Sequence, residues 1–399
     1  MNVKIKYLSG YLKLKIPEKI RVVNSLPDKI IKKLDSEAMR NILNKSLMSN
    51  KKISINFKNK KIAIIIEDIT RPIYLGEIVK ILIEELMRFG VKSSSITIIA
   101  ATGAHRIMKQ NDFEKKIGSA IASTINCISN DCENSQFKYL GIISKGIPLY
   151  INEDVVNADI KISIGTMFPH DMAGFSGGAK IILPGVSSLK TIEEFHRSNS
   201  GIFVYGKING VEPRYIIEEA GDIVGIDLSI NLIINQELQI ISIHAGNFRE
   251  SQRKAAIEFS KIYKKSNIEK TDIVISNCYP LGSDLYQVEK GLFPALFFAN
   301  HKAKILLISS CEEGIGFQRI VDENGILRKS SILYFKKLST NYDISFYSTG
   351  LKKSDCSEYF KYFKFFNNLD DSLSYLFNDK ESNCKSLSLL KASPLILTN

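Results

Sequence analysis

The residues best suited to chemistry gather in one stretch, GTMFPHDMAGFSGGAKIILPGVSSLKTIEEFHR (165–197). It holds two of the five histidines of the chain, His170 and His196, and a lysine, Lys180, that directly follows a run of small residues. Gly and Ala let a backbone approach a ligand closely, so a lysine on such a loop can meet a phosphate or an electrophile. A histidine can offer a ring nitrogen to a metal ion or to a proton. The stretch therefore has the composition of half an active site.

A turn with a solvated lysine is the simpler alternative for this stretch. It does not fit the phosphate loop G-x-x-x-x-G-K-[ST], because Ile181 stands where Ser or Thr is required and the glycine spacing differs. Taken alone, the stretch leaves both interpretations open.

The remaining candidates follow predicted strands. The apolar, β-branched run 61–66 predicts a buried parallel strand, and Asp68, Thr70 and Arg71 come directly after it. A second predicted strand, 95–100, leads to His105 and Arg106. Strand–loop–helix repeats are typical of a parallel α/β sheet, whose ligands bind at the carboxyl ends of the strands.

Each of these side chains also has a simpler explanation. Asp68 can cap the helix predicted over about 73–89, Arg71 can pair with Asp68, and His105 can lie in a surface loop. Two separate strand ends that both supply charged or titratable groups favour a functional site. Further strands predicted within 139–164 place His170 after a strand end as well.

A second α/β unit is predicted to begin at about residue 267, after a helix over 249–265. We expect an N-terminal α/β domain, 1–266, and a smaller C-terminal α/β domain, 267–399, whose last residues pack back on the first, with the active site in the cleft between the two. The strand predicted over 272–277 leads to Tyr286, Gln287 and Lys290, and the last two share one face of a helix. The other elements predicted are alternating stretches over 3–14, a helix over 27–47, a helix over 191–198, a strand pair over 228–244, and strands over 303–309 and 342–347.

Composition limits the class of protein. The chain has 399 residues with 44% hydrophobic and 24% charged side chains, which is ordinary for a globular protein of two domains. It has no apolar run near 18 residues and no signal-peptide pattern at its start, so we expect a cytoplasmic protein without a membrane segment. The net charge of +12 is mostly lysine scattered along the chain, and no nucleic-acid-binding signature accompanies it. The six cysteines form no C-x-x-C pair, so we expect free thiols.

Five segments together resemble the nickel-dependent lactate racemase family, enzymes that interconvert the stereoisomers of 2-hydroxy acids. They are EDITRP (67–72), ATGAHR (101–106), PHDMAGFSGGAKIILPGV (169–186), EEFHR (193–197) and YQVEK (286–290), in the order found in the family. The long central motif is highly specific, and the short motifs are weak alone.

The resemblance implies a nickel-pincer nucleotide, a pyridinium ring whose two sulfur-containing arms hold nickel, tethered to a lysine. Lys180 matches the tethering lysine, His196 the protein ligand of nickel, and His105 and His170 the acid/base pair. Matched residues with binding roles are Arg71, Gln287 and Lys290 for the substrate, and Asp68, Thr70, Ser176, Gly177 and Tyr286 for the cofactor. The implied partners are a small 2-hydroxy acid and the proteins that synthesise the cofactor, with no nucleic acid or membrane.

The chain departs from the family pattern at a few positions. Ile107 stands where Pro is frequent, Glu67 where Asp is frequent, and Ala179 precedes Lys180. Asp171 follows His170 and changes the polarity expected near the substrate.

The chemistry of a racemase explains these residue types. Removing the α-proton of a 2-hydroxy acid is difficult beside a carboxylate, whereas hydride transfer leaves a planar 2-keto acid that can be reduced from either face. That route needs a base on each face, and histidine suits it because its ordinary pKa is near 6.5. Arg71 can hold the carboxylate with two hydrogen bonds.

Two other functions remain as alternatives. A non-catalytic member of the family would bind the cofactor or a hydroxy acid without converting it, although a binder needs no base on each face. A nicotinamide-dependent dehydrogenase is disfavoured, because no G-x-G-x-x-G follows any predicted strand.

Overall fold

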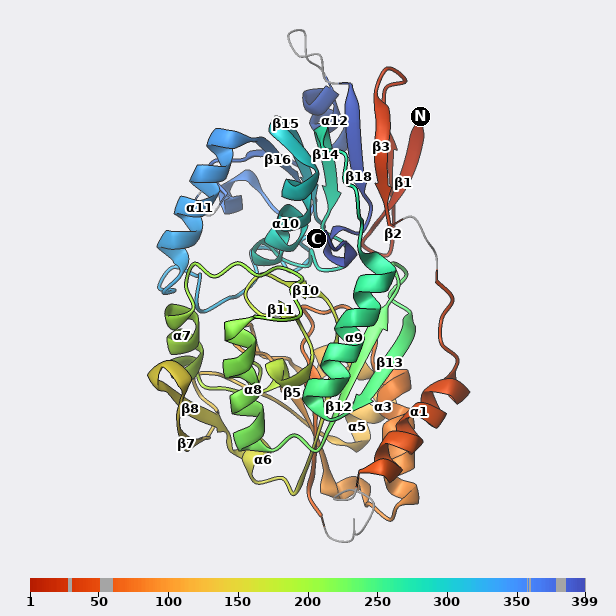
Figure 1. Ribbon diagram of the computed structural model, residues 1–399, viewed down its shortest axis with the longest axis vertical. Helices are drawn as coiled ribbons and strands as arrows, with labels where there is room; N and C mark the ends of the chain where they lie inside the picture. The colour runs from red at the N-terminus through yellow and green to blue at the C-terminus, as the bar shows by residue number, and fades with distance from the viewer. Residues whose placement is uncertain (28–30, 51–59, 357, 359, 378–384, 399) are drawn as a thin grey trace. The chain divides into compact units, whose positions relative to one another are not determined.

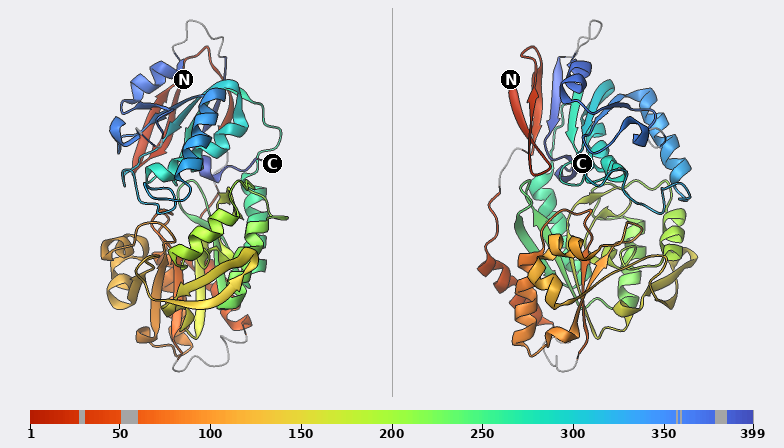
Figure 2. Two further views of the ribbon diagram at one scale, coloured as in Figure 1. Left: turned by 90° about the vertical axis from the view of Figure 1, so that its left-hand side faces the viewer. Right: turned by 180° about the vertical axis from the view of Figure 1, so that it is seen from behind.

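The computed structural model describes residues 1–27, 31–50, 60–356, 358, 360–377 and 385–398. It divides into two compact units, one of residues 31–262 and one of residues 1–30 together with 263–399. Each unit is an α/β body built on a six-stranded sheet, and Figures 1 and 2 show the ribbon from three sides. The predicted α/β class is confirmed.

The sheet of unit 31–262 has the strand order β13-β12-β9-β4-β5-β6. All neighbours are parallel except β12 and β13, which form an antiparallel pair. Its strands are β4 (Ile62–Glu67), β5 (Ile96–Ala101), β6 (Asn126–Ser129), β9 (Ile160–Thr166), β12 (Leu228–Ile234) and β13 (Ile240–Gly246). The central strands are buried on both faces, which explains the nearly continuous β-branched run of β4.

Helices cover both faces of this sheet. The chain moves from β4 to β5 in one direction and from β9 to β12 in the other, so right-handed crossovers place α3 and α8 on opposite faces, as the left view of Figure 2 shows. On one face, Ala63 and Ile65 share a hydrophobic cluster with Ile217 and Ala220 of α8. The helices are α1 (Ser36–Ser49), α3 (Gly76–Arg88), α4 (Gln110–Ile117), α5 (Ser119–Thr124), α6 (Glu153–Val156), α7 (Leu189–Ser198), α8 (Glu212–Val224) and α9 (Phe248–Tyr263).

Smaller elements complete this unit. The antiparallel pair β7 (Phe137–Ile143) and β8 (Ile147–Asn152) packs against α7. A short hairpin joins β10 (Pro169–His170) to β11 (Gly174–Phe175). The 3-10 helices are η1 (Ser93–Ser95), η2 (Ser144–Gly146) and η3 (Gly178–Ile181).

The other unit has an entirely parallel sheet in the order β17-β16-β15-β14-β18-β3. Its strands are β3 (Arg21–Leu26), β14 (Thr271–Asn277), β15 (Ala299–Ile308), β16 (Asp343–Tyr347), β17 (Lys364–Phe366) and β18 (Ser386–Leu390). The hairpin β1 (Asn2–Tyr7) and β2 (Gly10–Lys15) contributes Ile5 and Leu14 to the same core as Ile275 and Leu306. The helices are α10 (Glu289–Phe298), α11 (Arg328–Asn341), α12 (Leu369–Phe377), η4 (Leu285–Val288), η5 (Lys353–Cys356) and η6 (Ser393–Leu395).

The domain boundaries differ from the predicted 1–266 and 267–399. The break near residue 266 is close to the observed one, but residues 1–30 belong with the C-terminal unit. The reason is a strand pairing that no local pattern reveals, because β3 pairs in parallel with β18. The last residues likewise form β18, inside the sheet of their own unit, rather than a segment returning to the first domain.

Most predicted elements are confirmed within a few residues, and two differ. Of the helix predicted over 27–47, residues 28–30 lie outside the described residues and α1 begins at Ser36. The helix predicted from residue 73 begins at Gly76, because Leu75 donates its backbone N–H to Lys116 O, 2.8 Å away, before the helix starts.

The other sequence predictions concern the cysteines and membrane segments. Cys127, Cys132, Cys278, Cys311 and Cys356 are free thiols, as predicted, and Cys384 lies outside the described residues. No helix in the described part of the chain is long and apolar enough to cross a bilayer.

Candidate active site

The site in unit 31–262 is built on the carboxyl ends of three adjacent strands, β9, β4 and β5. The chain order reverses between β4 and β9, and ligands bind beside such a switch point in open α/β sheets. The two strand ends are joined there, because Glu67 accepts hydrogen bonds from the backbone N–H and the hydroxyl of Thr166, both at 2.7 Å. The predicted candidates that follow these strands therefore lie on one edge of one sheet.

Asp68 and His105, which follow β4 and β5, contact each other directly. His105 Nδ1 lies 2.7 Å from Asp68 Oδ2, and the two side chains are 20% and 6% exposed. The other carboxylate oxygen, Oδ1, accepts from the backbone N–H and the hydroxyl of Thr70, at 3.1 and 2.6 Å. Arg71 donates to the same Thr70 hydroxyl oxygen at 2.9 Å. One chain of hydrogen bonds thus runs from Arg71 to the imidazole of His105.

This arrangement keeps Asp68 ionised. Burial by itself raises the pKa of a carboxyl group, but His105, Arg71 and the Thr70 hydroxyl together lower the pKa of Asp68 to about 2. A carboxylate at Nδ1 favours the tautomer in which Nδ1 carries the proton and Nε2 presents a lone pair. Asp68 does not cap α3, whose N-cap residue is Leu75, so that simpler explanation of Asp68 is wrong.

A buried lysine supports the loop after β4. Lys116 of α4 donates to Arg71 O at 2.5 Å and to Glu67 Oε1 at 3.3 Å. Burial lowers the pKa of Lys116, whereas Glu67 and Asp68 raise it. Because Lys116 holds the backbone carbonyl of Arg71, it fixes the position from which the guanidinium extends.

His170 closes the short strand β10 and faces Gly174 across the hairpin. Its Nδ1 atom lies 3.2 Å from the backbone nitrogens of both Met172 and Ala173 and 3.0 Å from Asp171 Oδ1. The side chain is 17% exposed. His170 follows β9 and His105 follows β5, so the two histidines come from the two strands that flank β4.

The glycine-rich segment after β11 packs against the sheet without spare room. Gly177 has φ +76°, and a Cβ atom there would lie 2.5 Å from Asn231 Oδ1 and 2.7 Å from Met167 Sδ. Asn231 Oδ1 also accepts from the N–H of Gly178 at 2.8 Å. Ser176 donates to Thr166 O at 2.5 Å and accepts from Phe168 N–H at 2.7 Å. Ser176 and Gly177 therefore hold the loop on the end of β9, and their predicted contact with a cofactor remains a prediction.

Lys180 lies in η3, which follows this loop and packs against β9, β12, β4 and α8. The chain beyond it returns to the loop after β5, where Gly103 donates its N–H to Gly185 O at 2.9 Å. The lysine is thus carried by a short turn that is held between the strand ends bearing His105 and His170.

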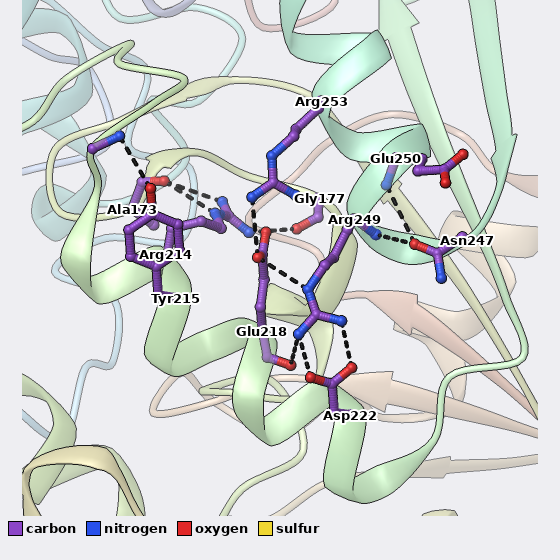
Figure 3. Close-up of polar contacts among 11 residues, drawn as sticks. Ala173, Gly177, Arg214, Tyr215, Glu218, Asp222, Asn247, Arg249, Glu250 and Arg253 are labelled. Atoms are coloured by element: carbon purple, nitrogen blue, oxygen red, sulfur yellow. Dashed lines mark hydrogen bonds and ion pairs between the residues drawn. The ribbon is translucent and has the colours of Figure 1, made fainter.

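Arg214 of α8 is a buried arginine that binds the same loop from behind (Figure 3). Its guanidinium donates to Ala173 O at 3.3 Å and Gly177 O at 3.1 Å, and also to Phe175 O. Burial lowers the pKa of Arg214 to about 10, even though Glu218 on the next turn acts against this shift. One side chain therefore fixes three carbonyl groups in the segment that runs from the turn of the His170 hairpin to η3.

His196 lies in the last turn of α7, a helix capped by Ser188. Its Nδ1 lies 2.7 Å from the carbonyl oxygen of Ile192, one turn earlier. A carbonyl only accepts, so Nδ1 carries the proton and Nε2 has the lone pair that a metal ion requires. Phe195 packs edge-on against the ring, 5.3 Å between centroids. The described residues contain no group of three or more His, Cys, Asp or Glu side chains that could hold a metal ion.

The three remaining candidates lie in the other unit. Tyr286 and Gln287 are in η4, and Lys290 is in the first turn of α10. Asp284 caps this segment by accepting from Gln287 N–H at 3.0 Å. Burial raises the pKa of Tyr286. Their participation in one site with the residues of unit 31–262 remains a prediction.

Sequence reasoning missed several supporting residues: Arg214, Lys116, Thr166 and Asn231. Arg214 left a signal, since it lies three and four residues before Ile217 and Glu218 on the buried face of α8, an unusual place for an arginine. Lys116 left none, because its partners are distant in the chain. His244 of β13 pairs with Glu258 of α9 at 2.6 Å.

Comparisons with known proteins agree with this fold. A family model described as the lactate racemase N-terminal domain matches residues 7–201. The lactate racemase of Thermoanaerobacterium thermosaccharolyticum is 26% identical over 325 residues, covering 79% of this chain and 76% of that protein. The lactate racemase of Lactiplantibacillus plantarum is 28% identical over 291 residues, covering 71% and 68%.

Solved structures extend the similarity of the fold. The lactate racemase apoprotein from T. thermosaccharolyticum superposes with a TM-score of 0.77 at 22% identity, over the whole of both chains. A protein from Thermotoga maritima superposes with a TM-score of 0.70 at 17% identity, over 93% of this chain and all of that one. Together the fold and the sequence matches define an α/β isomerase. Residues 7–201 match the N-terminal domain of lactate racemases, and most of the chain is similar in sequence to two lactate racemases.

Proposed function

We propose that this protein is a racemase or epimerase of a 2-hydroxy acid that works by hydride transfer with two histidine bases. The observation that carries the proposal is the placement of His105 and His170 after β5 and β9, the two neighbours of β4, with Arg71 on the loop after β4. A base on each side of a carboxylate-binding arginine is what inversion at C2 requires. The relatives described above, which are lactate racemases, support the same class of reaction.

The residues of this chain have distinct roles in the proposal. Arg71 binds the substrate carboxylate with two parallel hydrogen bonds. One histidine takes the proton of the C2 hydroxyl group, and the other returns a proton when the opposite stereoisomer forms. Asp68 keeps the proton of His105 on Nδ1, so Nε2 is the basic atom. Gln287 and Lys290 are further proposed contacts of the substrate, and Lys290 adds positive charge near the developing keto oxygen.

We assign a nickel-pincer nucleotide to this site, attached covalently to Lys180, with His196 as the protein ligand of nickel. The tautomer of His196 fits, because its Nε2 atom has the lone pair, and nickel accepts one imidazole beside soft donors in a square plane. When bound, this group supplies the electrophilic carbon that takes up and returns the hydride of C2. Asp68, Thr70, Ser176, Gly177 and Tyr286 are its proposed further contacts, the proteins that synthesise it are the proposed partners, and the cytoplasm is the proposed compartment.

The cofactor assignment is tested by intact mass and nickel analysis of protein produced together with the cofactor-synthesis proteins. Wild-type protein is expected to gain several hundred daltons in mass. It should also contain about one nickel ion per chain, because the chain has one proposed nickel site. Lys180→Ala is expected to remain unmodified. Lys190→Ala is the matched control, since Lys190 lies in the same stretch but on α7, above the ring of Tyr150. Unmodified wild-type protein would contradict the assignment.

The reaction is tested with 2-hydroxy acids of one configuration that carry deuterium at C2. A hydride mechanism predicts loss of chirality with deuterium retained at C2. Loss of chirality with exchange of deuterium for solvent hydrogen would indicate proton abstraction instead. Unchanged chirality and label for every acid tested, with loaded protein, would favour the non-catalytic binder.

A further inference from the structure

His170 Nδ1 has two kinds of neighbour that demand opposite protonation states. The backbone N–H groups of Met172 and Ala173, each 3.2 Å away, are donors and favour an unprotonated Nδ1. The carboxylate of Asp171, 3.0 Å away, is an acceptor and favours a protonated Nδ1. A ring nitrogen has one in-plane position for a proton or a lone pair, so these neighbours compete to select the tautomer.

The carboxylate has the advantage in this competition. A hydrogen bond to an ionised acceptor is about twice as strong as one between neutral groups. Asp171 is also the nearer neighbour, and its side chain is 27% exposed, so it lies partly out of water. With Nδ1 protonated, the basic lone pair of the ring is on Nε2.

The backbone holds Asp171 in place. Its carbonyl oxygen accepts from Val204 N–H at 2.6 Å, and Gly206 donates its N–H to Gly174 O at 2.9 Å, so the segment 204–206 binds both sides of the hairpin. Tyr205, which lies between these two contacts, is buried. Burial is the main cause that raises the pKa of its hydroxyl group, and the negative charge of Asp171 raises it further.

We propose that Asp171 is a positioning residue that keeps the proton of His170 on Nδ1 and makes Nε2 the basic atom. The proposal rests on the racemase function above and deepens it. His105 has a comparable contact, a hydrogen bond between Nδ1 and the carboxylate of Asp68. The two histidines then form matched Asp–His pairs, one after β5 and one after β9. In a racemase the bases exchange roles between the two directions, so equal partners serve both directions equally.

The first test reads the tautomer in the protein without cofactor. Histidine is labelled with ¹⁵N, and ring signals are recorded at a pH where imidazole is neutral, with His170→Gln used to identify the signals of His170. In wild-type protein, Nδ1 of His170 is expected to give a protonated-type shift and Nε2 a lone-pair-type shift. The reverse assignment in wild-type protein overturns the proposal, and it requires no change at Asp171.

Asp171→Asn provides the comparison in the same experiment. An asparagine amide offers a donor or an acceptor, so Met172 and Ala173 N–H decide the tautomer, and the lone pair is expected to move to Nδ1. An unchanged tautomer in Asp171→Asn overturns the proposal. Because this readout needs neither cofactor nor turnover, it stands whether or not the racemase function holds.

The second test uses the loaded enzyme and a substrate that it racemises. Asp171→Asn is expected to lower kcat by roughly 10²- to 10⁴-fold, the usual size of a general acid–base contribution, with little change in KM. Asp171→Glu is expected to recover part of kcat, which a purely structural role of the side chain would not predict. An unchanged kcat in Asp171→Asn, with the tautomer shifted, overturns the role of this tautomer in the reaction.

Discussion

Asp68 Oδ2 and His105 Nδ1 lie 2.7 Å apart, although they follow different strands and belong to different loops. Through Thr70, the same carboxylate is linked to the guanidinium of Arg71. A proposed base and a proposed substrate-binding group are therefore positioned by one buried side chain. A change at Asp68 is expected to disturb both functions together.

Asp68 is expected to make folding stability sensitive to acid. Its pKa is lowered to about 2 in the folded protein, against about 3.9 in an unfolded chain. A lowered carboxyl pKa stabilises the fold above the unfolded value, and this stabilisation, roughly 2 kcal/mol, is lost as pH falls from about 5 toward 2. Urea unfolding of wild-type protein and Asp68→Asn measures it, and the difference between the two should shrink as the pH falls.

Asp154→Asn is the control for this measurement, since Asp154 is an exposed aspartate on α6 of the same unit. It is expected to leave the acid dependence of unfolding as in wild-type protein. A difference between wild type and Asp68→Asn that stays constant from pH 6 to pH 3 would contradict the account of Asp68.

Gly177 is expected to tolerate no side chain. Gly177→Ala places a methyl group within 2.5 Å of Asn231 Oδ1 and forces a positive φ on alanine. The variant should lose about 1 kcal/mol for the backbone and a further 1–3 kcal/mol for overpacking. Gly210→Ala separates the two costs, because Gly210 has φ +67° with no atom within 4 Å of the new methyl group. Equal losses of unfolding free energy in the two variants would contradict the packing argument.

Arg214 is expected to be the most sensitive of the arginines in Figure 3. Arg214→Met leaves the carbonyls of Ala173, Phe175 and Gly177 without this donor and Glu218 without its buried neighbour. The loss should be about 3–5 kcal/mol, because buried carbonyl groups left without a donor cost roughly 1–3 kcal/mol each. Modification of Lys180, measured by intact mass, should fall in the same variant, because the loop that carries it is no longer held.

Arg249→Met is the matched control for Arg214. Arg249 is 35% exposed and shares Glu218 with Arg253, so its removal leaves Glu218 paired and should cost about 1 kcal/mol or less. Similar thermal unfolding of the two variants would show that the carbonyl contacts of Arg214 contribute little.

Substitutions of His196 and of Lys180 are expected to have different effects on the proposed cofactor. His196→Ala removes the imidazole but leaves the lysine, so the added mass should remain while nickel content falls. Intact mass and metal analysis of one preparation give both values. His244→Ala, which removes a histidine paired with Glu258, should retain both mass and nickel. Full nickel content in His196→Ala would exclude His196 as the ligand.

The sequence predicted the strands around the site well, because β4 is a nearly continuous β-branched run and charged or titratable residues follow β4, β5 and β9. It predicted His105 and His170 as candidates because they follow strand ends, and Lys180 because it follows a run of small residues. It did not predict the partners that hold them. The partners of these side chains are distant in the sequence. The hydrogen bonds that Lys116, Arg214 and Asn231 form at the site join residues 37 to 53 positions apart, and no local pattern encodes such pairs.

The same limit explains the wrong domain boundary. The alternation in residues 3–14 indicated strands correctly, but no residue near 21–26 indicates which strand pairs with this segment. Arg21 pairs with Ser386 and Leu26 with Leu390. The membership of β3 is decided by a segment at the other end of the chain.

That pairing has a consequence for biosynthesis. Residues 31–262 form an insertion between β3 and the rest of its unit, and the ribosome completes them long before it makes β18. Domains fold as units during synthesis, so the inserted unit can reach its final structure before β18, the strand that pairs with β3, has been made. Pairing of such distant segments is intrinsically slow. A nascent chain released before residue 386 would therefore present a folded histidine- and lysine-bearing unit beside an incomplete one, whose edge at β14 is open to foreign strands.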